Sequence, residues 1–245
     1  MLPLVVVLLG FAPIARNCPA QSGSDPTPFS AKYNWGVFAE DSPTSSPMLL
    51  GNTRQREQIA VGAALTRRLL ARRHFELDYL VEVRPLLLES DPTVVSLYSN
   101  QYGYVEFSPP LPVVDPGNLA NFFNIGISPY AYGGYSNARF SRRWTYVGGV
   151  DPFGFKVNGF QHRRIQPEAM VNAGLLVATR DIPIKQSSYF NFAFQFGGGV
   201  QWYRTASQSL LLEYRFQHFS SKNLGTYNPG TDAGIFKLTY WFGEN

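Results

Sequence analysis

The fold is decided by the stretch FNFAFQFGGGVQW, which runs from Phe190 to Trp202. Its even positions carry four phenylalanines, a glycine, a valine and the tryptophan, whereas its odd positions are all small or polar. Successive side chains of a β-strand point to opposite faces. The alternation therefore predicts a strand with one aromatic face and one small, polar face.

The same alternation recurs along the chain. In Phe75–Val83, the odd positions are apolar and three of the four even positions are acidic. The pattern also slips near Asp151-Pro152, which indicates a β-bulge. Six further segments are predicted strands: Tyr33–Ala39, Gln58–Leu69, Tyr146–Val157, Ile165–Ala178, Ser209–Ser220 and Asp232–Phe242. Eight such segments fit an all-β, eight-stranded antiparallel barrel.

Periodicity alone leaves open which face of the barrel is outside. A soluble ligand-binding barrel turns its apolar face inward, and a membrane barrel turns it outward. An eight-stranded barrel has room inside for little more than its own side chains, and the apolar face here is crowded with aromatic residues and leucine. We therefore predict a transmembrane barrel whose polar face is inside. Its interior charges are then able to pair with one another: Glu76, Asp78, Glu82, Arg84, Glu213, Arg215 and Lys237.

The amino end is typical of an exported protein. An apolar run from Leu2 to Ile14, too short to cross a bilayer as a helix, is followed by small residues before Gln21. We predict a signal peptide at residues 1–20 and a single β-barrel domain at 21–245, with strands from about 33 to 242. Export of a β-barrel predicts that the protein lies in the bacterial outer membrane.

Composition and connection lengths agree with this interpretation. Aromatic residues make up 15% of the 245 residues and charged residues only 16%, which is unusual for a soluble surface. The formal net charge of +4 is too mild and too scattered to indicate a nucleic-acid partner. Some connections are short, whereas Asp41–Glu57 and the Pro-rich Glu89–Ser141 are long. We predict that the second of these is a long irregular connection.

Two polar residues continue the apolar row of the penultimate strand. Its even positions are apolar from Leu210 to Phe216, and His218 and Ser220 follow in the same row. Polar groups that face lipid are costly unless they are paired or lie near the interface. Residues two apart lie about 6.6 Å apart along a strand, on the same side. An imidazole can reach across that gap to a serine hydroxyl, so we expect His218 to be able to serve as the base for Ser220.

An acid opens the last strand on the same face. If the hairpin is symmetric about Thr226, Asp232 lies opposite Ser220 and diagonal to His218, within side-chain reach. The three groups needed for acyl transfer, His218, Ser220 and Asp232, then converge on the outer face of the barrel. The three histidines have no metal-ligand spacing with a carboxylate or the single cysteine, so the sequence predicts neither a metal nor a cofactor.

The local sequence resembles that of a known family. The stretch YRFQHFS at 214–220, followed by NPGTD at 228–232, resembles the carboxyl-terminal signature of the lipid A 3-O-deacylase (PagL-type) family. Upstream, VDPFGF at 150–155 and QPE at 166–168 are similar to segments of outer-membrane acyloxyacyl hydrolases. The resemblance implies a carboxylic ester hydrolase that removes the acyl chain at the 3-position of lipid A. Lipopolysaccharide in the outer-membrane lipid is then the implied substrate and partner.

The resemblance also implies a role for individual residues. His218 stands at the position of the family's base and Ser220 at that of its nucleophile. Asp232 matches the family's acid, which is usually a glutamate and one methylene longer. The family's oxyanion hole is built from backbone amides, which match Ser221 and Asn223 here.

Two other functions remain open at this point. A structural or adhesive outer-membrane barrel without catalytic activity would show the same strand pattern. Asp232, in place of the family's usual glutamate, is compatible with this alternative. An exported ligand-binding barrel would instead place His218 and Ser220 inside.

Overall fold

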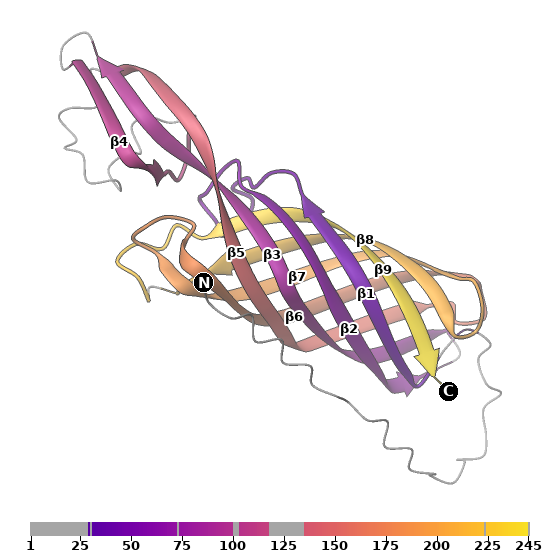
Figure 1. Cartoon of the computed structure of the whole chain (residues 1–245). Coiled ribbons are helices and arrows are strands. Elements are labelled where there is room, and N and C mark those ends of the chain that lie inside the picture. The colour runs from indigo at the N-terminus through magenta and orange to yellow at the C-terminus, as the bar shows by residue number, and fades with distance from the viewer. Residues whose placement is uncertain are drawn as a thin grey trace.

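The computed structural model of the chain describes residues 29, 31–72, 74–99, 103–117, 135–222 and 224–244. The predicted signal peptide at 1–20 and Asn223 lie outside these residues. The described part is an antiparallel β-structure (Figure 1). Its strands are β1 (Tyr33–Ser42), β2 (Glu57–Ala71), β3 (Phe75–Ser99), β4 (Gly103–Pro112), β5 (Tyr135–Gly159), β6 (Ile165–Ile182), β7 (Ser188–Tyr203), β8 (Gln208–Ser220) and β9 (Thr231–Glu244).

Eight of these strands close into a ring. The sheet order is β2-β1-β9-β8-β7-β6-β5-β3, and an additional pairing between β2 and β3 closes the barrel. The remaining strand, β4, pairs with β3 outside the ring. The predicted eight-stranded antiparallel barrel is therefore confirmed.

Within Glu89–Ser141, which the sequence predicted to be an irregular connection, the described residues 89–99, 103–112 and 135–141 are strands. Strands β3 and β5 stay paired beyond the ring, and β4 adds to β3, so that a three-stranded extension projects from the barrel (Figure 1). The β-branched run Thr93-Val94-Val95 favours this extended backbone. Val94 and Leu97 are buried against Val113 in a small hydrophobic cluster of the extension. This local core explains why the extension is ordered as a sheet.

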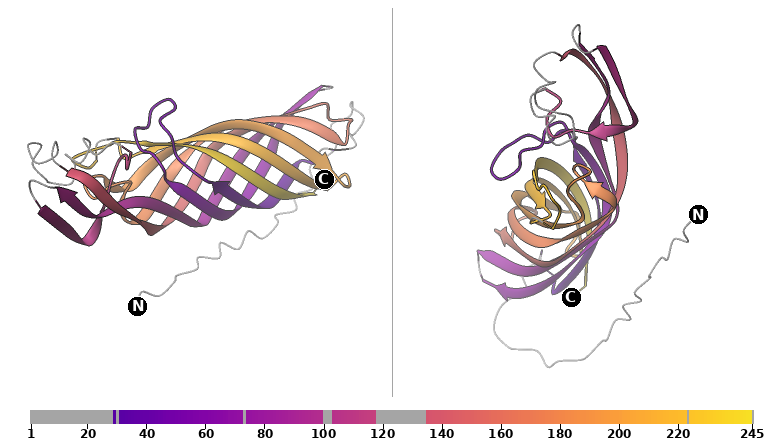
Figure 2. Two further views of the ribbon diagram at one scale, coloured as in Figure 1. Left: turned by 90° about the horizontal axis from the view of Figure 1, so that it is seen from above. Right: turned by 90° about the vertical axis from the view of Figure 1, so that its left-hand side faces the viewer.

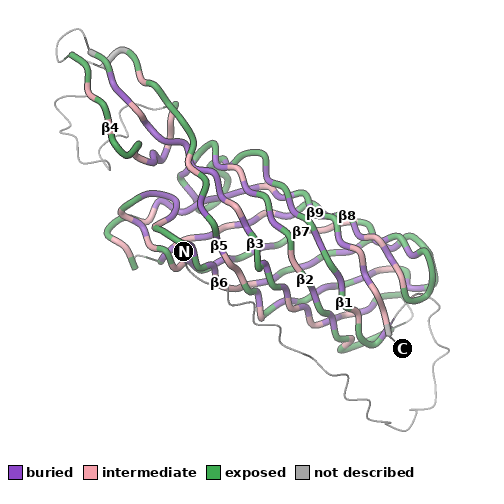
Figure 3. The backbone as a smooth tube through the Cα atoms, viewed as in Figure 1, coloured by how far each residue is buried: buried purple, intermediate pink, exposed green. Residues whose placement is uncertain are grey.

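The apolar face of the barrel is outside, as predicted. On β7, Phe192, Phe194 and Phe196 are 40–43% exposed, whereas Asn191 and Gln195 are fully buried. Exposed and buried positions alternate in the same way around the ring (Figure 3). An outer wall of aromatic and aliphatic side chains is the arrangement that a lipid environment stabilises. Among the described residues, no helix has the length and apolar character to cross a bilayer.

A network of ion pairs lies in the barrel interior, beside clusters of buried apolar side chains. Glu82 accepts from Arg215 Nη1 at 2.8 Å, Lys237 Nζ at 2.5 Å and Arg84 Nη2 at 3.2 Å, and its side chain is fully buried. Arg84 is further paired with Glu40 at 2.8 Å. Charges in a dry interior are stable only when such partners surround them. The predicted pairing is thus present for Glu82, Arg84, Glu213, Arg215 and Lys237.

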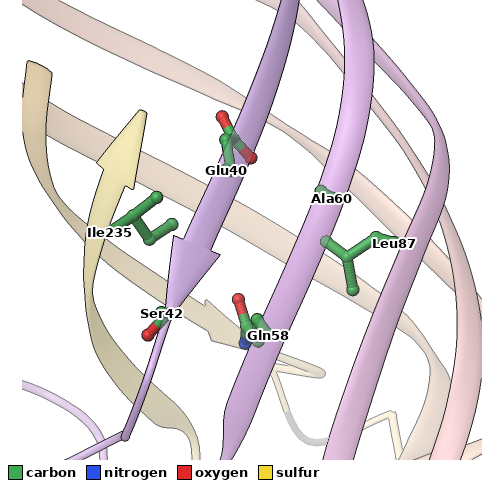
Figure 4. A pocket seen from close by; sticks show the side chains of 6 residues that line it. All are labelled: Glu40, Ser42, Gln58, Ala60, Leu87 and Ile235. Carbon is green, nitrogen blue, oxygen red and sulfur yellow. The ribbon is translucent and has the colours of Figure 1, made fainter. Parts of the chain in front are cut away.

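A small pocket opens on the inner wall, between β1, β2, β3 and β9 (Figure 4). Polar and apolar side chains line it together: Glu40, Ser42, Gln58, Ala60, Leu87 and Ile235. Because these residues face the interior, the pocket lies on the opposite face of the wall from the outward row of β8.

The predicted bulge is present in β5. The register against β6 shifts between Val150 and Phe153, and Asp151 is turned into the interior, where it pairs with Arg84. On β5, the even residues face outward before this point, and Phe153 and the odd residues that follow it face outward after it. The bulge therefore keeps apolar side chains outside although the alternation slips.

The two ends of the barrel differ. Tyr33, at the start of β1, pairs with Glu244, at the end of β9. The first and the last strand residues of the barrel therefore lie at the same end of it. The β1–β2 and β8–β9 connections lie at the other end, from which the three-stranded extension also projects (Figure 2). We call this second end the loop end.

Candidate active site

The candidate site lies where β8 ends, at the loop end of the barrel. His218 and Ser220 continue the outward row of β8, as predicted, and both are half-buried. Across the sheet on β7, Phe194 is paired with His218 and Phe192 with Ser220. Two polar groups thus stand beside an aromatic strip on the outer wall.

Asp232 is the direct cross-strand partner of His218. The imidazole Nδ1 lies 2.7 Å from the carboxylate Oδ1. The sequence placed Asp232 opposite Ser220, and this register was wrong by two residues, because β8 and β9 pair about Gly225 rather than Thr226. A shift of two residues keeps the side chain on the same face of the sheet. Asp232 therefore still faces outward, and it lies closer to the histidine than predicted.

The pairing with Asp232 sets the role of each histidine nitrogen. A carboxylate accepts hydrogen bonds only, so Nδ1 carries the proton that it donates to Asp232. Nε2 is then the nitrogen that can take up a proton. Ser220 is the next outward residue along β8, on the same side of the strand. His218 is thus joined through Nδ1 to a carboxylate, and the Ser220 hydroxyl belongs to the next outward residue of the same strand.

A backbone nest holds the other oxygen of Asp232. Oδ2 accepts the N–H groups of Met48 at 3.1 Å, Leu49 at 2.6 Å and Leu50 at 2.9 Å, all from the β1–β2 connection. The Asp232 side chain is fully buried beneath this segment, although it projects from the outer face. Sequence analysis missed these donors because a backbone N–H in a loop leaves no mark on the residue types.

The amide of Ser221 already has a partner. Ser221 is fully buried, and its N–H donates to Asn228 Oδ1 at 3.1 Å, while its hydroxyl lies 3.3 Å from the same oxygen. Asn228 belongs to the stretch that carries the family resemblance, but the sequence assigned it no role. The second predicted amide, that of Asn223, lies outside the described residues.

Further contacts hold the β8–β9 connection above the site. Tyr227 N–H donates to Gln186 O at 3.0 Å, which ties the connection to the β6–β7 turn. Gly230 has a φ of +61°, and a Cβ there would lie 2.9 Å from His218 Cε1. Glycine at this position meets both demands, since it adopts left-handed backbone readily and leaves room for the imidazole.

More than half of the chain, including β8 and most of β9, also matches the model of a known protein family. Residues 101–241 match the family model for the lipid A 3-O-deacylase (PagL), a span that includes β4 to β8, nearly all of β9, and His218, Ser220 and Asp232, but not the Met48–Leu50 nest. No protein of curated function matches the chain.

Two solved structures resemble the barrel. The crystal structure of the outer membrane enzyme PagL is 12% identical, with a TM-score of 0.48, and the match covers 85% of this chain and 99% of that one. The crystal structure of Neisserial surface protein A is 11% identical, with a TM-score of 0.40, and the match covers 87% and 98%. Because both likenesses are weak, the assignment rests on the family model. The chain belongs to the lipid A 3-O-deacylase (PagL) family, a family of hydrolases, and is an outer-membrane β-barrel.

Proposed function

We propose that this chain hydrolyses the acyl ester at the 3-position of lipid A, with Ser220 as nucleophile, His218 as base and Asp232 as the acid that orients the base. The observation that carries the proposal is the 2.7 Å contact between His218 Nδ1 and Asp232 Oδ1 on the outer face of a lipid-facing wall. A barrel with a purely structural role does not require a carboxylate and a histidine at that place, because polar side chains on a lipid-facing wall are costly.

The reaction proceeds through an acyl-enzyme. His218 Nε2 takes the Ser220 proton as Oγ attacks the ester carbonyl, and the tetrahedral intermediate then expels the sugar hydroxyl, which receives that proton. Water hydrolyses the acyl-enzyme in the same manner, releasing the fatty acid and restoring Ser220. Asp232 holds the imidazole in the required tautomer and stabilises its cationic form. No metal or organic cofactor takes part in these steps.

Backbone amides just past Ser220 are the proposed oxyanion donors, namely those of Ser221 and Asn223. Such donors stabilise the charge that develops on the carbonyl oxygen, and each typically contributes about 100- to 1,000-fold in rate. The Ser221 amide donates to Asn228 Oδ1. We therefore propose that the oxyanion replaces this side-chain oxygen as the acceptor during the reaction.

The position of the site fits a lipid substrate. Ser220 lies at the loop end of the outer wall, next to the aromatic strip of β7, where an acyl chain can remain in hydrocarbon while its ester reaches the hydroxyl. With both chain ends in the periplasm, the loop end lies at the outer leaflet, which lipopolysaccharide occupies.

The test is mass spectrometry of lipid A from cells that express the chain. The wild type should yield lipid A that lacks one ester-linked acyl chain, together with the free fatty acid. Ser220→Ala should lower this conversion by more than about 1,000-fold. Ser207→Ala, in the turn at the opposite end of the barrel, is the matched control and should act like the wild type. Unchanged lipid A with a correctly inserted wild type would instead favour the structural barrel.

A further inference from the structure

The β1–β2 connection is fastened to the candidate site along its length. Ser46 N–H donates to Asp232 O at 3.2 Å, and Ser45 forms a bridge with Ala233. On the far side, Asn52 N–H donates to Pro229 O at 2.8 Å. The segment from residue 45 to residue 53 is thus anchored on both sides of Asp232.

Between these anchors the segment offers its backbone rather than its side chains. The N–H groups of Met48, Leu49 and Leu50 converge on Asp232 Oδ2 at 2.6–3.1 Å, while their side chains are 46–66% exposed. Successive N–H groups that point into one concavity form an anion-binding nest. The anion held here is the carboxylate that contacts His218.

The close approach of the segment depends on a glycine. A Cβ on Gly51 would lie 2.5 Å from Asp232 N and 2.9 Å from Asp232 Oδ1. Backbone atoms at that distance cannot accommodate a methyl group without displacement of the segment. A single methyl group at position 51 should therefore be enough to move the nest away from the Asp232 carboxylate.

We propose that Met48–Gly51 is a positioning element of the enzyme: it fixes the Asp232 carboxylate by backbone donors so that Oδ1 is presented to His218. This inference rests on the proposed function, because it assigns the segment a part in that reaction. A short aspartate swings freely about its two torsions, and three donors on Oδ2 leave Oδ1 in one place. The element thus supplies, from a connection distant in sequence, the orientation that the acid needs.

The test is a double-mutant cycle between Gly51 and Asp232. Gly51→Ala should lower kcat by about 10- to 100-fold with little change in KM, since a misplacement of about 1 Å carries a cost of this size. In an Asp232→Asn background the same substitution should cause little further loss, because the residue through which it acts is already disabled. Gly148→Ala is the matched control, since a Cβ there meets nothing within 4 Å. Equal losses in both backgrounds, or no loss in either, would overturn the proposal.

A second arm is independent of activity. If the nest holds the carboxylate, the carboxylate also holds the nest, because coupling between two groups is reciprocal. Asp232→Ala should therefore speed tryptic cleavage after the half-exposed Arg54 in folded barrels, and Ser220→Ala should not. Equal cleavage of Asp232→Ala and wild type would contradict the inference even if the chain were an active deacylase. Faster cleavage in a chain without any deacylase activity would support the contact and contradict the proposed function alone.

Discussion

The family resemblance implies a longer glutamate at the position of Asp232, and the register explains how the shorter side chain reaches His218. Directly opposed residues of an antiparallel pair have Cα atoms about 4.5–5.5 Å apart, whereas diagonal neighbours are about 7–8 Å apart. Asp232 is directly opposite His218, so one methylene group suffices to bring Oδ1 within 2.7 Å of Nδ1. The substitution by aspartate is thus compatible with an oriented histidine.

Substitutions at Asp232 test this fit. Asp232→Asn should lower kcat on the order of 100- to 10,000-fold, because the amide can present a donor to His218 and stabilise the wrong tautomer. Asp232→Glu should also be slower than the wild type, by about 10-fold, since an added methylene in a fully buried site costs about 1–3 kcal/mol of strain. Deacylation rates of purified barrels in mixed micelles provide the measurement. Full activity of Asp232→Asn would remove the carboxylate from the mechanism.

Strands and loops differ in how far the sequence predicts them. The alternation in Phe190–Trp202 predicted β7 and its aromatic face because one residue type repeats on one side of the strand. That this face lies outside followed from the small interior of an eight-stranded barrel. In β4, three prolines interrupt any such alternation, and the strand is held by pairing with β3 instead. Tertiary pairing, which no local pattern encodes, therefore accounts for the missed extension.

The same limit explains the errors at the site. His218, Ser220 and the face of Asp232 followed from side-chain type and parity. The register between β8 and β9 did not, because it depends on how the connection closes on itself through the Ser221 amide and Asn228. The nest of Met48–Leu50 depends on the direction of backbone N–H groups. Neither the residue types nor their alternation reveals that direction.

The interior ion pairs make a prediction at the level of the strands that carry them. Glu82, on β3, joins Arg84 of its own strand to Arg215 of β8 and Lys237 of β9, so its loss leaves three buried cations with fewer partners. Glu82→Gln should lower the free energy of unfolding by about 3–5 kcal/mol, the cost of breaking a buried pair.

Urea unfolding in lipid vesicles, followed by tryptophan fluorescence, measures this change. The control is Glu57→Gln at the loop end, where the Glu57 side chain is 38% exposed and pairs with Arg142 at 3.2 Å. An exposed pair of that kind contributes only about 0–1 kcal/mol. Equal effects of the two substitutions would mean that the interior charges are more hydrated than their burial indicates.

At the scale of the whole molecule, closure of the ring leaves none of its eight strands with an unpaired edge along the barrel. Every strand of the ring is hydrogen-bonded on both sides within the barrel, so unfolding must break the β1–β9 or another seam before any strand is released. Closed barrels in a membrane need this arrangement, because lipid offers no partner for an unpaired backbone group.

This closure predicts a shift in gel mobility with heating. Unheated protein in dodecyl sulfate should migrate as the compact folded barrel. Boiled protein should migrate at a different position, as the unfolded chain. Gel electrophoresis of unheated and boiled samples from the membrane fraction gives the result directly. A single band at one position under both conditions, from a chain recovered with soluble proteins, would rule out the membrane barrel.

The three-stranded extension carries the strand edges that the ring itself eliminates. Its outer strand, β4, contains prolines at 109, 110 and 112, and the part of β5 that forms its other edge contains the exposed Arg139. Prolines withhold backbone donors, and a positive charge on an edge strand repels the same strand of a second molecule. These features protect the projecting sheet against edge-to-edge aggregation with its neighbours. The molecule can expose a long hairpin to its surroundings and still remain dispersed.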